Sequence, residues 1–247
     1  LVVEGSIPTG ADGAYCTIGG HSAVEDCKKL VQNAAATICV GSCSSFGGIP
    51  AAAPNPTDAV SVGSLVPGAT IINLPGCPVN ATNLTATIVH FMTFGKLPAV
   101  DSLSRPKFAY GKRIHDNCER RGHFDAGQYA ESFGDEAHRQ GHCLYKLGCK
   151  GPESFHNCPT VRYNEGTSWP VMAGHGCIGC SEPGFWDTMS PFYRRLPKVP
   201  GFGIEDTADK IGIGLAAATA VAFGIHGVAS CFRKGDAMEE DKVVKED

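Results

Sequence analysis

Residues 37–43 of the chain are Thr-Ile-Cys-Val-Gly-Ser-Cys, and residues 70–78 are Thr-Ile-Ile-Asn-Leu-Pro-Gly-Cys-Pro. Each stretch is a short apolar run followed by a glycine-containing turn that carries a cysteine. Apolar runs without polar alternation, each followed by a helical pattern, are typical of a parallel sheet covered by helices. Loops at the carboxyl ends of parallel strands gather at one edge of the sheet. We therefore expect Cys43 and Cys77 to meet at that edge, where they can share one ligand.

The rest of the first hundred residues fits the same α/β pattern. We expect strands over residues 1–7, 37–40 and 70–74, and helices over 22–35 and 81–94. Asn80 or Thr82 is placed to cap the second helix, and Gly95 is placed to end it. Because the chain opens with Leu1 in the middle of an apolar run, we expect this domain, residues 1–104, to lack its natural start.

From Arg105 onward the pattern changes, and we expect a second domain over residues 105–247. Helical and strand periodicity fades, and six of the twelve cysteines lie between Cys118 and Cys180. A long segment with little regular structure needs another source of stability, which metal clusters would supply. A net charge of −4 and a charged fraction of 19% exclude disorder and argue against a nucleic-acid partner.

Residues 211–232 contain no Asp, Glu, Lys or Arg, and this stretch is long enough to cross a bilayer. Its many glycines suit close packing of helices in a membrane, but equally a helix buried between subunits. We favour the buried helix. Ten of the fifteen residues from 233 to 247 are charged, which predicts a solvated tail.

The spacing of the cysteines favours metal clusters over disulfides. Zinc sites normally combine two close pairs of ligands, whereas here one close pair accompanies scattered single cysteines. Ligands of an iron–sulfur cluster are more widely spread, because they must reach several irons. Glycines beside the close pair would let backbone N–H groups approach an anionic cluster. The pattern consists of His115-x-x-Cys118, Cys143-x5-Cys149, Cys158-Pro159 and Cys177-Ile178-Gly179-Cys180.

His115 is the more specific signal in this set. A histidine three residues before a cysteine lies on the same face of a helical turn as that cysteine. Neutral imidazole is a competent iron ligand, and it lacks the negative charge of a thiolate. Exchange of a thiolate for imidazole raises the reduction potential of a cluster, which suits a position at the end of a relay.

Longer motifs between residues 157 and 187 resemble the small subunit of nickel–iron hydrogenases of the membrane-bound uptake type. The resemblance runs from residue 1 to about residue 232 and includes residues 3–8 (Val-Glu-Gly-Ser-Ile-Pro), 75–78 (Pro-Gly-Cys-Pro) and 114–118 (Ile-His-Asp-Asn-Cys). Its most specific parts are Asn157-Cys158-Pro159, Thr167-Ser168-Trp169-Pro170, residues 174–183 (Gly-His-Gly-Cys-Ile-Gly-Cys-Ser-Glu-Pro) and Phe185-Trp186-Asp187.

The resemblance implies a flavodoxin-like parallel-sheet domain followed by an irregular, mostly helical iron–sulfur domain. It also implies two [4Fe–4S] clusters and one [3Fe–4S] cluster in a row. The distal [4Fe–4S] cluster would be held by His115, Cys118, Cys143 and Cys149. The medial [3Fe–4S] cluster would be held by Cys158, Cys177 and Cys180, with Pro170 about where a fourth ligand could have been. Half of the proximal [4Fe–4S] cluster would be held by Cys43 and Cys77.

The remaining two proximal ligands belong to a Cys-x-x-Cys segment of the family that this sequence lacks. Oxygen-tolerant relatives carry an extra cysteine at about the place of Gly48, so the resemblance implies an ordinary proximal cluster. Cys16, Cys27, Cys39 and Cys231 match no ligand position, and Cys27 and Cys39 fit the core.

In this family the chemistry takes place at a nickel–iron centre on a large partner subunit, so we expect no catalytic residue on this chain. The expected assembly is a heterodimer that transfers electrons from H2 to a cytochrome-type acceptor on the periplasmic side of the cytoplasmic membrane, with possible anchoring in that membrane. The basic residues that bracket His115 offset the charge of the cluster, dock an acidic face of this acceptor, or form an ordinary solvated surface; they are Lys107, Lys112, Arg113, Arg120 and Arg121.

Four other interpretations are weighed against this one. The cluster-bearing small subunit of respiratory complex I resembles the first half of the chain, but it has no counterpart of the six cysteines from 118 to 180. A disulfide-stabilised protein or a zinc module would explain the cysteine count without iron. A stand-alone enzyme is not supported, because the sequence contains no G-x-S-x-G, H-E-x-x-H or Walker motif.

Overall fold

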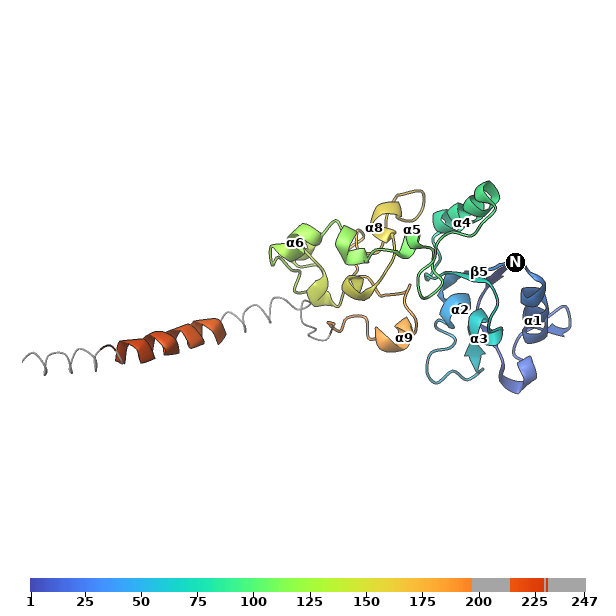
Figure 1. Ribbon diagram of the computed structural model, residues 1–247, viewed down its shortest axis with the longest axis horizontal. Helices are drawn as coiled ribbons and strands as arrows, with labels where there is room; N and C mark the ends of the chain where they lie inside the picture. Colours follow the sequence, from blue (N-terminus) through green and yellow to red (C-terminus); the bar gives the residue numbers. More distant parts are fainter. Residues whose placement is uncertain (197–213, 229, 231–247) are drawn as a thin grey trace, which may run out of the picture. The chain divides into compact units, whose positions relative to one another are not determined.

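The computed structural model describes residues 1–196, 214–228 and 230 (Figure 1). Its centre is a three-stranded parallel sheet in the order β1 (Val2–Glu4), β5 (Thr37–Val40) and β7 (Ile71–Leu74). Cys39 lies opposite Val3 on one side and opposite Asn73 on the other. The α/β prediction and two of its strands are therefore confirmed.

The predicted first strand over residues 1–7 is wrong in its extent. The structure contains β1 and, after a break, β2 (Ile7–Pro8), which pairs antiparallel with β6 (Ala59–Val60). Gly5 between them has a φ of +85°, a conformation that glycine adopts readily and other residues rarely adopt. The turn at Gly5 takes the chain out of the parallel sheet, and the apolar pattern on its two sides gives no sign of the turn.

Four helices accompany the sheet in this part: α1 (Ala23–Asn33), α2 (Gly41–Phe46), α3 (Val62–Leu65) and α4 (Ala81–Phe94). The Asn80 side chain accepts a hydrogen bond of 3.0 Å from the Thr82 amide, and Gly95 ends α4 in the left-handed conformation, as predicted. A small hairpin of β3 (Thr17–Ile18) and β4 (His21–Ser22) precedes α1, and the turn η1 (Gly10–Gly13) lies before it. The buried core between α1, α3 and the sheet contains Cys27 and Cys39, as predicted for these two cysteines.

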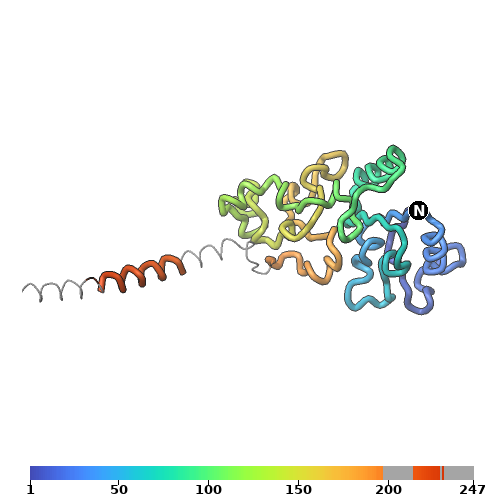
Figure 2. The backbone as a smooth tube through the Cα atoms, in the orientation of Figure 1, coloured from blue at the N-terminus to red at the C-terminus, as the bar shows by residue number. Residues whose placement is uncertain are grey.

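The part of the chain from α5 to α9 is irregular and mostly helical (Figure 2). This confirms the second half of the fold prediction. Its buried core surrounds Trp169 and includes Ile114, Leu144, Val171 and two of the cysteines. Its elements are short: α5 (Lys107–Tyr110), η2 (Ile114–Asn117), α6 (Arg121–Asp125), α7 (Glu136–Arg139), η3 (Tyr145–Leu147), η4 (Gly151–Glu153), α8 (Cys158–Val161) and α9 (Phe185–Thr188).

Residues 1–196 form one compact unit, and residues 197–247 form a second. The boundary expected near residue 104 lies inside the first unit and stays a prediction. In the second unit, residues 214–228 are helical and exposed. Among the residues that the structure describes, no helix has both the length and the apolar character needed for a membrane span. The stretch 211–232 lies partly, and the charged tail wholly, outside these residues, so both expectations stay predictions.

Candidate metal centres

The four residues predicted to hold the distal cluster line one cavity. His115 lies on η2, Cys118 ends that turn, and Cys143 and Cys149 flank η3. The cavity contains about 360 Å³ of empty space, and all four donor side chains contribute to its wall. Residues up to 34 positions apart in the sequence are therefore brought to one place.

The environment of His115 favours the neutral imidazole. The side chain is 8% exposed and packs edge-to-face on Phe124, with ring centroids 4.5 Å apart. Desolvation lowers the pKa of His115 to about 4, and the nearby charge of Arg121 acts in the same direction. Neutral imidazole is the form that binds iron.

The predicted medial residues line a second cavity. Cys158 begins α8, and Cys177 and Cys180 lie on the glycine-rich segment that follows Trp169. Pro170 also lines this cavity; that it stands in the place of a fourth ligand stays a prediction. The buried His156 places its Nδ1 atom 2.9 Å from the Sγ atom of Cys158.

Cys43 and Cys77 line a third cavity, at the carboxyl edge of the sheet. Cys43 lies in α2 directly after β5, and Cys77 follows β7, so the expectation from the two quoted stretches is confirmed. A Cβ atom at Gly48 would lie 2.7 Å from the Cys43 Sγ atom, so this glycine packs directly on a predicted ligand. Cys77 also lines the medial cavity, so it stands between the two sites.

All six thiols of the distal and medial sites have raised pKa values, and desolvation is the largest cause in each case. It raises the pKa of Cys118 to about 11 and that of Cys143 to about 12. Repulsion between neighbouring thiolates adds to this effect, for example between Cys177 and Cys149. A cluster of buried thiolates is stable only when cations compensate its charge, and bound iron provides them.

Backbone amides point at several of these sulfurs. The Arg120 amide donates to Cys118 Sγ over 3.4 Å, and the Gly179 amide donates to Cys177 Sγ over 3.4 Å. The Cys177 amide donates to Cys149 Sγ over 3.3 Å, which links the medial and distal donor sets. Amide donors of this kind stabilise thiolate ligands and tune cluster potentials. The glycines beside Cys177 and Cys180 led us to expect backbone N–H groups close to the sulfurs in this segment.

Three buried polar atoms at these cavities have no hydrogen-bond partner among the described residues. Arg120 Nε belongs to a residue that lines the distal cavity, and His156 Nε2 and Trp169 Nε1 belong to residues that line the medial cavity. Buried polar atoms are rarely left unpaired, and sulfides of a cluster accept hydrogen bonds. The donor sets therefore fit iron–sulfur clusters. In the described part of the chain, no three His, Cys, Asp or Glu groups are arranged to hold a single metal ion.

The cysteines outside the three sites are also accounted for. Each of the cysteines between residues 16 and 180 is free, so the disulfide that the spacing of Cys143 and Cys149 allowed is not formed. Cys16 is half-buried near the first hairpin and contributes to none of the three cavities. Cys231 lies outside the described residues.

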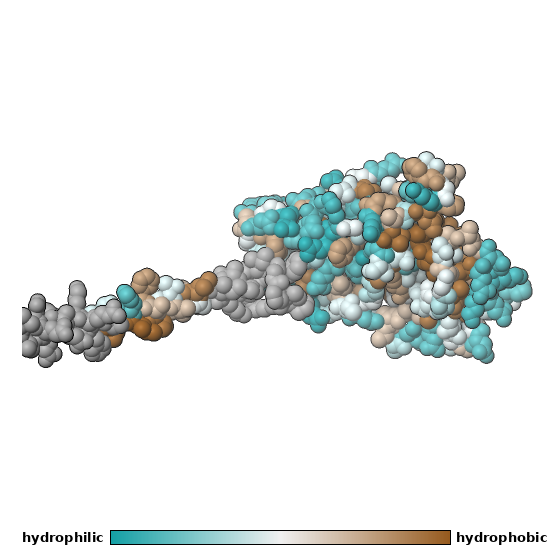
Figure 3. All heavy atoms as spheres, viewed as in Figure 1, coloured by the Kyte–Doolittle hydropathy of each residue, from teal (hydrophilic) through white to brown (hydrophobic). Residues whose placement is uncertain are grey.

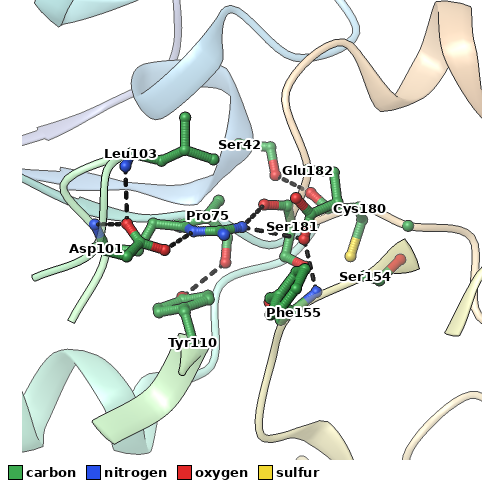
Figure 4. A network of polar contacts seen from close by, with 12 residues as sticks. Ser42, Pro75, Asp101, Leu103, Tyr110, Ser154, Phe155, Cys180, Ser181 and Glu182 are labelled. Atoms are coloured by element: carbon green, nitrogen blue, oxygen red, sulfur yellow. Dashed lines mark hydrogen bonds and ion pairs between the residues drawn. The ribbon is translucent and has the colours of Figure 1, made fainter. Parts of the chain in front are cut away.

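The sequence did not identify two buried cations that organise these sites. Lys150 is 2% exposed and donates to the carbonyl oxygens of Gly148 (2.7 Å), Phe192 (3.3 Å) and Arg194. Arg105 is 4% exposed and binds Asp101 at 2.8 Å and Glu182 at 3.0 Å. Figure 4 shows Asp101 and Glu182 at the two sides of this network. A single basic residue in a loop usually lies at the surface, so the sequence contains no signal for either role.

Gly176 gives a direct test of the distal site. A Cβ atom there would lie 2.9 Å from the Cys149 Cα atom and 3.1 Å from its N and Cβ atoms, so the backbone must move. We expect Gly176→Ala to displace Cys149, to destabilise the chain by about 1–3 kcal/mol, and to lower the bound iron. The matched control is Gly122→Ala, because a Cβ atom at Gly122 has no neighbour within 4 Å. Bound iron is measured as iron per chain, and stability is measured by thermal melting, in both variants. Equal results for Gly176→Ala and Gly122→Ala would contradict the assignment of Cys149.

Comparison with known proteins gives two family matches. Residues 110–193 match the family described as the C-terminal part of the NiFe/NiFeSe hydrogenase small subunit, and residues 1–91 match the NADH ubiquinone oxidoreductase 20 kDa subunit. The second match agrees with the similarity of the first half to a complex I protein. The first match contains every residue predicted for the distal and medial sites, from His115 to Cys180.

Curated relatives cover nearly the whole chain. The small chain of the quinone-reactive Ni/Fe-hydrogenase of Wolinella succinogenes is 52% identical over 95% of this chain and 68% of its own length. The uptake hydrogenase small subunit of Azotobacter vinelandii is 50% identical over 95% of this chain and 65% of its own length. The chain thus spans about two thirds of the length of these relatives.

Solved structures agree with this result. The reduced, active Ni-Fe-Se hydrogenase of Desulfomicrobium baculatum is 34% identical with a TM-score of 0.73, over 79% of this chain and 75% of that one. The actinobacterial-type NiFe-hydrogenase of Ralstonia eutropha is 27% identical with a TM-score of 0.72, over 87% of this chain and 70% of that one.

Proposed function

The chain belongs to the small-subunit family of nickel–iron hydrogenases, and we propose that its three cavities hold the proximal, medial and distal iron–sulfur clusters of an H2-oxidising enzyme. Proteins of this family are the electron-transfer subunits of the hydrogenase. The proposed ligands are those expected from the sequence: Cys43 and Cys77 for the proximal [4Fe–4S] cluster, Cys158, Cys177 and Cys180 for the medial [3Fe–4S] cluster, and His115, Cys118, Cys143 and Cys149 for the distal [4Fe–4S] cluster.

One observation carries this proposal. Each predicted donor set lines its own cavity, and neighbouring sets are joined, since Cys77 lines two cavities and the Cys177 amide binds the sulfur of Cys149. An order of proximal, medial and distal sites follows from these links. When bound, the clusters would accept and release single electrons.

The chain's own residues prepare these sites. Burial of Cys143, Cys158 and Cys177 keeps water from the sulfurs, and the amide donors compensate part of the thiolate charge. Trp169 Nε1 and Arg120 Nε have no hydrogen-bond partner within the described part of the chain, and both belong to residues that line the cavities, where they can donate to a cluster. The neutral imidazole of His115 reduces the negative charge of the distal site and thereby favours a higher potential at the end that faces the acceptor.

In this proposal, H2 is oxidised at a nickel–iron centre on a large partner subunit. Several apolar side chains of α4 are exposed, namely Val89, Phe91, Met92 and Phe94. Hydrophobic residues also gather on the face of the molecule that Figure 3 shows. An exposed apolar surface of this kind suits burial against a partner subunit. We therefore propose that the chain functions as one half of a heterodimer.

The acceptor and the location are also proposals. The relative from Wolinella succinogenes is described as quinone-reactive, and the relative from Azotobacter vinelandii is described as an uptake hydrogenase small subunit. We propose that electrons leave the distal site for a cytochrome-type acceptor that reduces quinone, at the periplasmic side of the cytoplasmic membrane. The side chain of Arg121, which lines the distal cavity and is partly exposed, is suited to docking an acidic face of that acceptor.

Metal and sulfide analysis of the purified complex tests the proposed function. We expect iron and acid-labile sulfide with this chain, nickel with a larger chain that copurifies, and a paramagnetic three-iron signal in the oxidised sample. Zinc without iron would overturn the proposal. A complete set of [4Fe–4S] clusters without the three-iron signal would contradict the medial assignment alone.

A further inference from the structure

Ser42 lies between the proximal and medial sites and is 2% exposed. It belongs to α2, directly before Cys43, and it pairs with Gly76 in both directions. The Ser42 amide donates to the Gly76 carbonyl oxygen over 3.0 Å, and the Gly76 amide donates to Ser42 Oγ over 2.9 Å. The loops that carry Cys43 and Cys77 are thus joined through the residues next to those cysteines.

The same hydroxyl reaches the medial site. Ser42 Oγ donates to the carbonyl oxygen of Cys180, a residue 138 positions away in the sequence (Figure 4). One buried hydroxyl therefore bonds the backbone beside Cys77 and at Cys180, and it belongs to the residue that precedes Cys43. Cys77 and Cys180 line the same cavity, so a predicted ligand of one site borders a predicted ligand of the next.

The far side of the Cys180 segment is fixed independently. Arg105 donates to the Ser181 carbonyl oxygen over 3.1 Å, and Ser181 Oγ donates to the Phe155 carbonyl oxygen over 3.0 Å. With this support on one side, the hydroxyl of Ser42 is the contact that draws the segment against the Cys77 loop. Without it, the Gly76 amide loses its acceptor and the Cys180 carbonyl loses this donor.

We propose that Ser42 is a positioning residue for electron transfer from the proximal to the medial site. This inference rests on the proposed function, because it presumes that Cys77 and Cys180 are cluster ligands. Oxidation of H2 yields two protons and two electrons, and each electron crosses this junction singly, so that the proximal site loses one electron and the medial site gains it. Ser42 ties the Gly76–Cys77 turn to the backbone of Cys180, which keeps the path between the sites short.

The test compares three variants in the assembled complex: Ser42→Ala, which removes the hydroxyl; Ser42→Thr, which keeps it; and Ser44→Ala. Ser44 is the matched control, because it lies in the same helix, is fully buried, and donates only to carbonyls of its own segment, Val40 at 2.8 Å and Gly41 at 3.2 Å. The readouts are the rate at which H2 reduces the medial three-iron signal in freeze-quenched samples, and the hydrogen–deuterium exchange of the segment that contains Gly76.

For Ser42→Ala we expect the medial reduction rate to fall by roughly 10-fold or more, the scale typical for partners of metal ligands. Exchange at Gly76 should become faster, while Ser42→Thr and Ser44→Ala retain both values of the unaltered complex. Exchange of D2 with water, which needs only the nickel–iron centre, should be unchanged. An unchanged reduction rate in Ser42→Ala with faster exchange at Gly76 would overturn the proposed role.

Two further outcomes keep the inference distinct from the proposed function. Absence of the three-iron signal from the unaltered complex would count against the ligand assignment and hence against the function itself. If Ser42→Ala does not assemble, the amide of Gly76 is measured in the unaltered complex: slow exchange supports the buried hydrogen bond to Ser42, and fast exchange contradicts it.

Discussion

Replacement of Cys177 by alanine is expected to abolish electron transfer from H2 to an external acceptor. Cys177 is buried in the medial cavity, its sulfur accepts from the Gly179 amide, and its own amide binds the sulfur of Cys149. Loss of a partner beyond the ligand shell typically costs about 10–100-fold, and loss of a ligand costs more. We expect the three-iron signal to disappear and dye reduction to fall to background, while D2 exchange at the partner's centre continues.

The matched control is Cys27→Ala. Cys27 is also a buried free cysteine, but it lies in α1 within the core beside the sheet, away from the three cavities. This variant loses a small amount of buried sulfur surface and should retain the three-iron signal and dye reduction. A full three-iron signal in Cys177→Ala would contradict the medial assignment, as would equal loss in both variants.

Replacement of Arg105 by methionine is expected to destabilise the chain by about 3–5 kcal/mol. Its guanidinium group is buried between Asp101 and Glu182 and lies 5.6 Å from the ring centroid of Tyr110. Methionine fills much of the space but leaves two largely buried carboxylates without their cation. Because Glu182 also accepts from the Phe155 amide at 2.6 Å, the segment after Cys180 should loosen with it.

The measurement is thermal unfolding of the complex, followed both by ellipticity and by loss of the visible absorption of the clusters. Arg139→Met is the control, because Arg139 and its partner Glu136 are 70% and 71% exposed and lie 3.6 Å apart. An exposed pair of this kind contributes at most about 1 kcal/mol. Equal unfolding curves for Arg105→Met and Arg139→Met would show that the buried network does not stabilise the Cys180 segment.

The sequence predicted the parts of the molecule that depend on local pattern. The bounds of β5 and of α4, the cap at Asn80 and the turn at Gly95 follow from apolar periodicity and from residues with strong local preferences. The break at Gly5 was missed, because the residues on both sides of it are apolar and glycine alone does not show whether a strand continues. The three donor sets came from the resemblance to the hydrogenase small subunit, and their members line three cavities; their role as cluster ligands stays a prediction.

The contacts that position the ligands could not be predicted from local pattern. The bond from Ser42 to Cys180 joins residues 138 positions apart, and the bond from Arg105 to Glu182 joins residues 77 positions apart. Serine and arginine are common at surfaces, so their types do not show that they are buried. Only the folded chain places Ser42 at two ligand loops, and the same holds for the unpaired Trp169 Nε1 at the medial cavity.

Diffraction from crystals of the purified complex at the iron absorption edge tests the central claim most directly. We predict three separate anomalous peaks in a row: one beside Cys43 and Cys77, one beside Cys158, Cys177 and Cys180, and one beside His115, Cys118, Cys143 and Cys149. Sulfurs bonded to each other at these positions, or a map without iron at the distal cavity, would contradict the account.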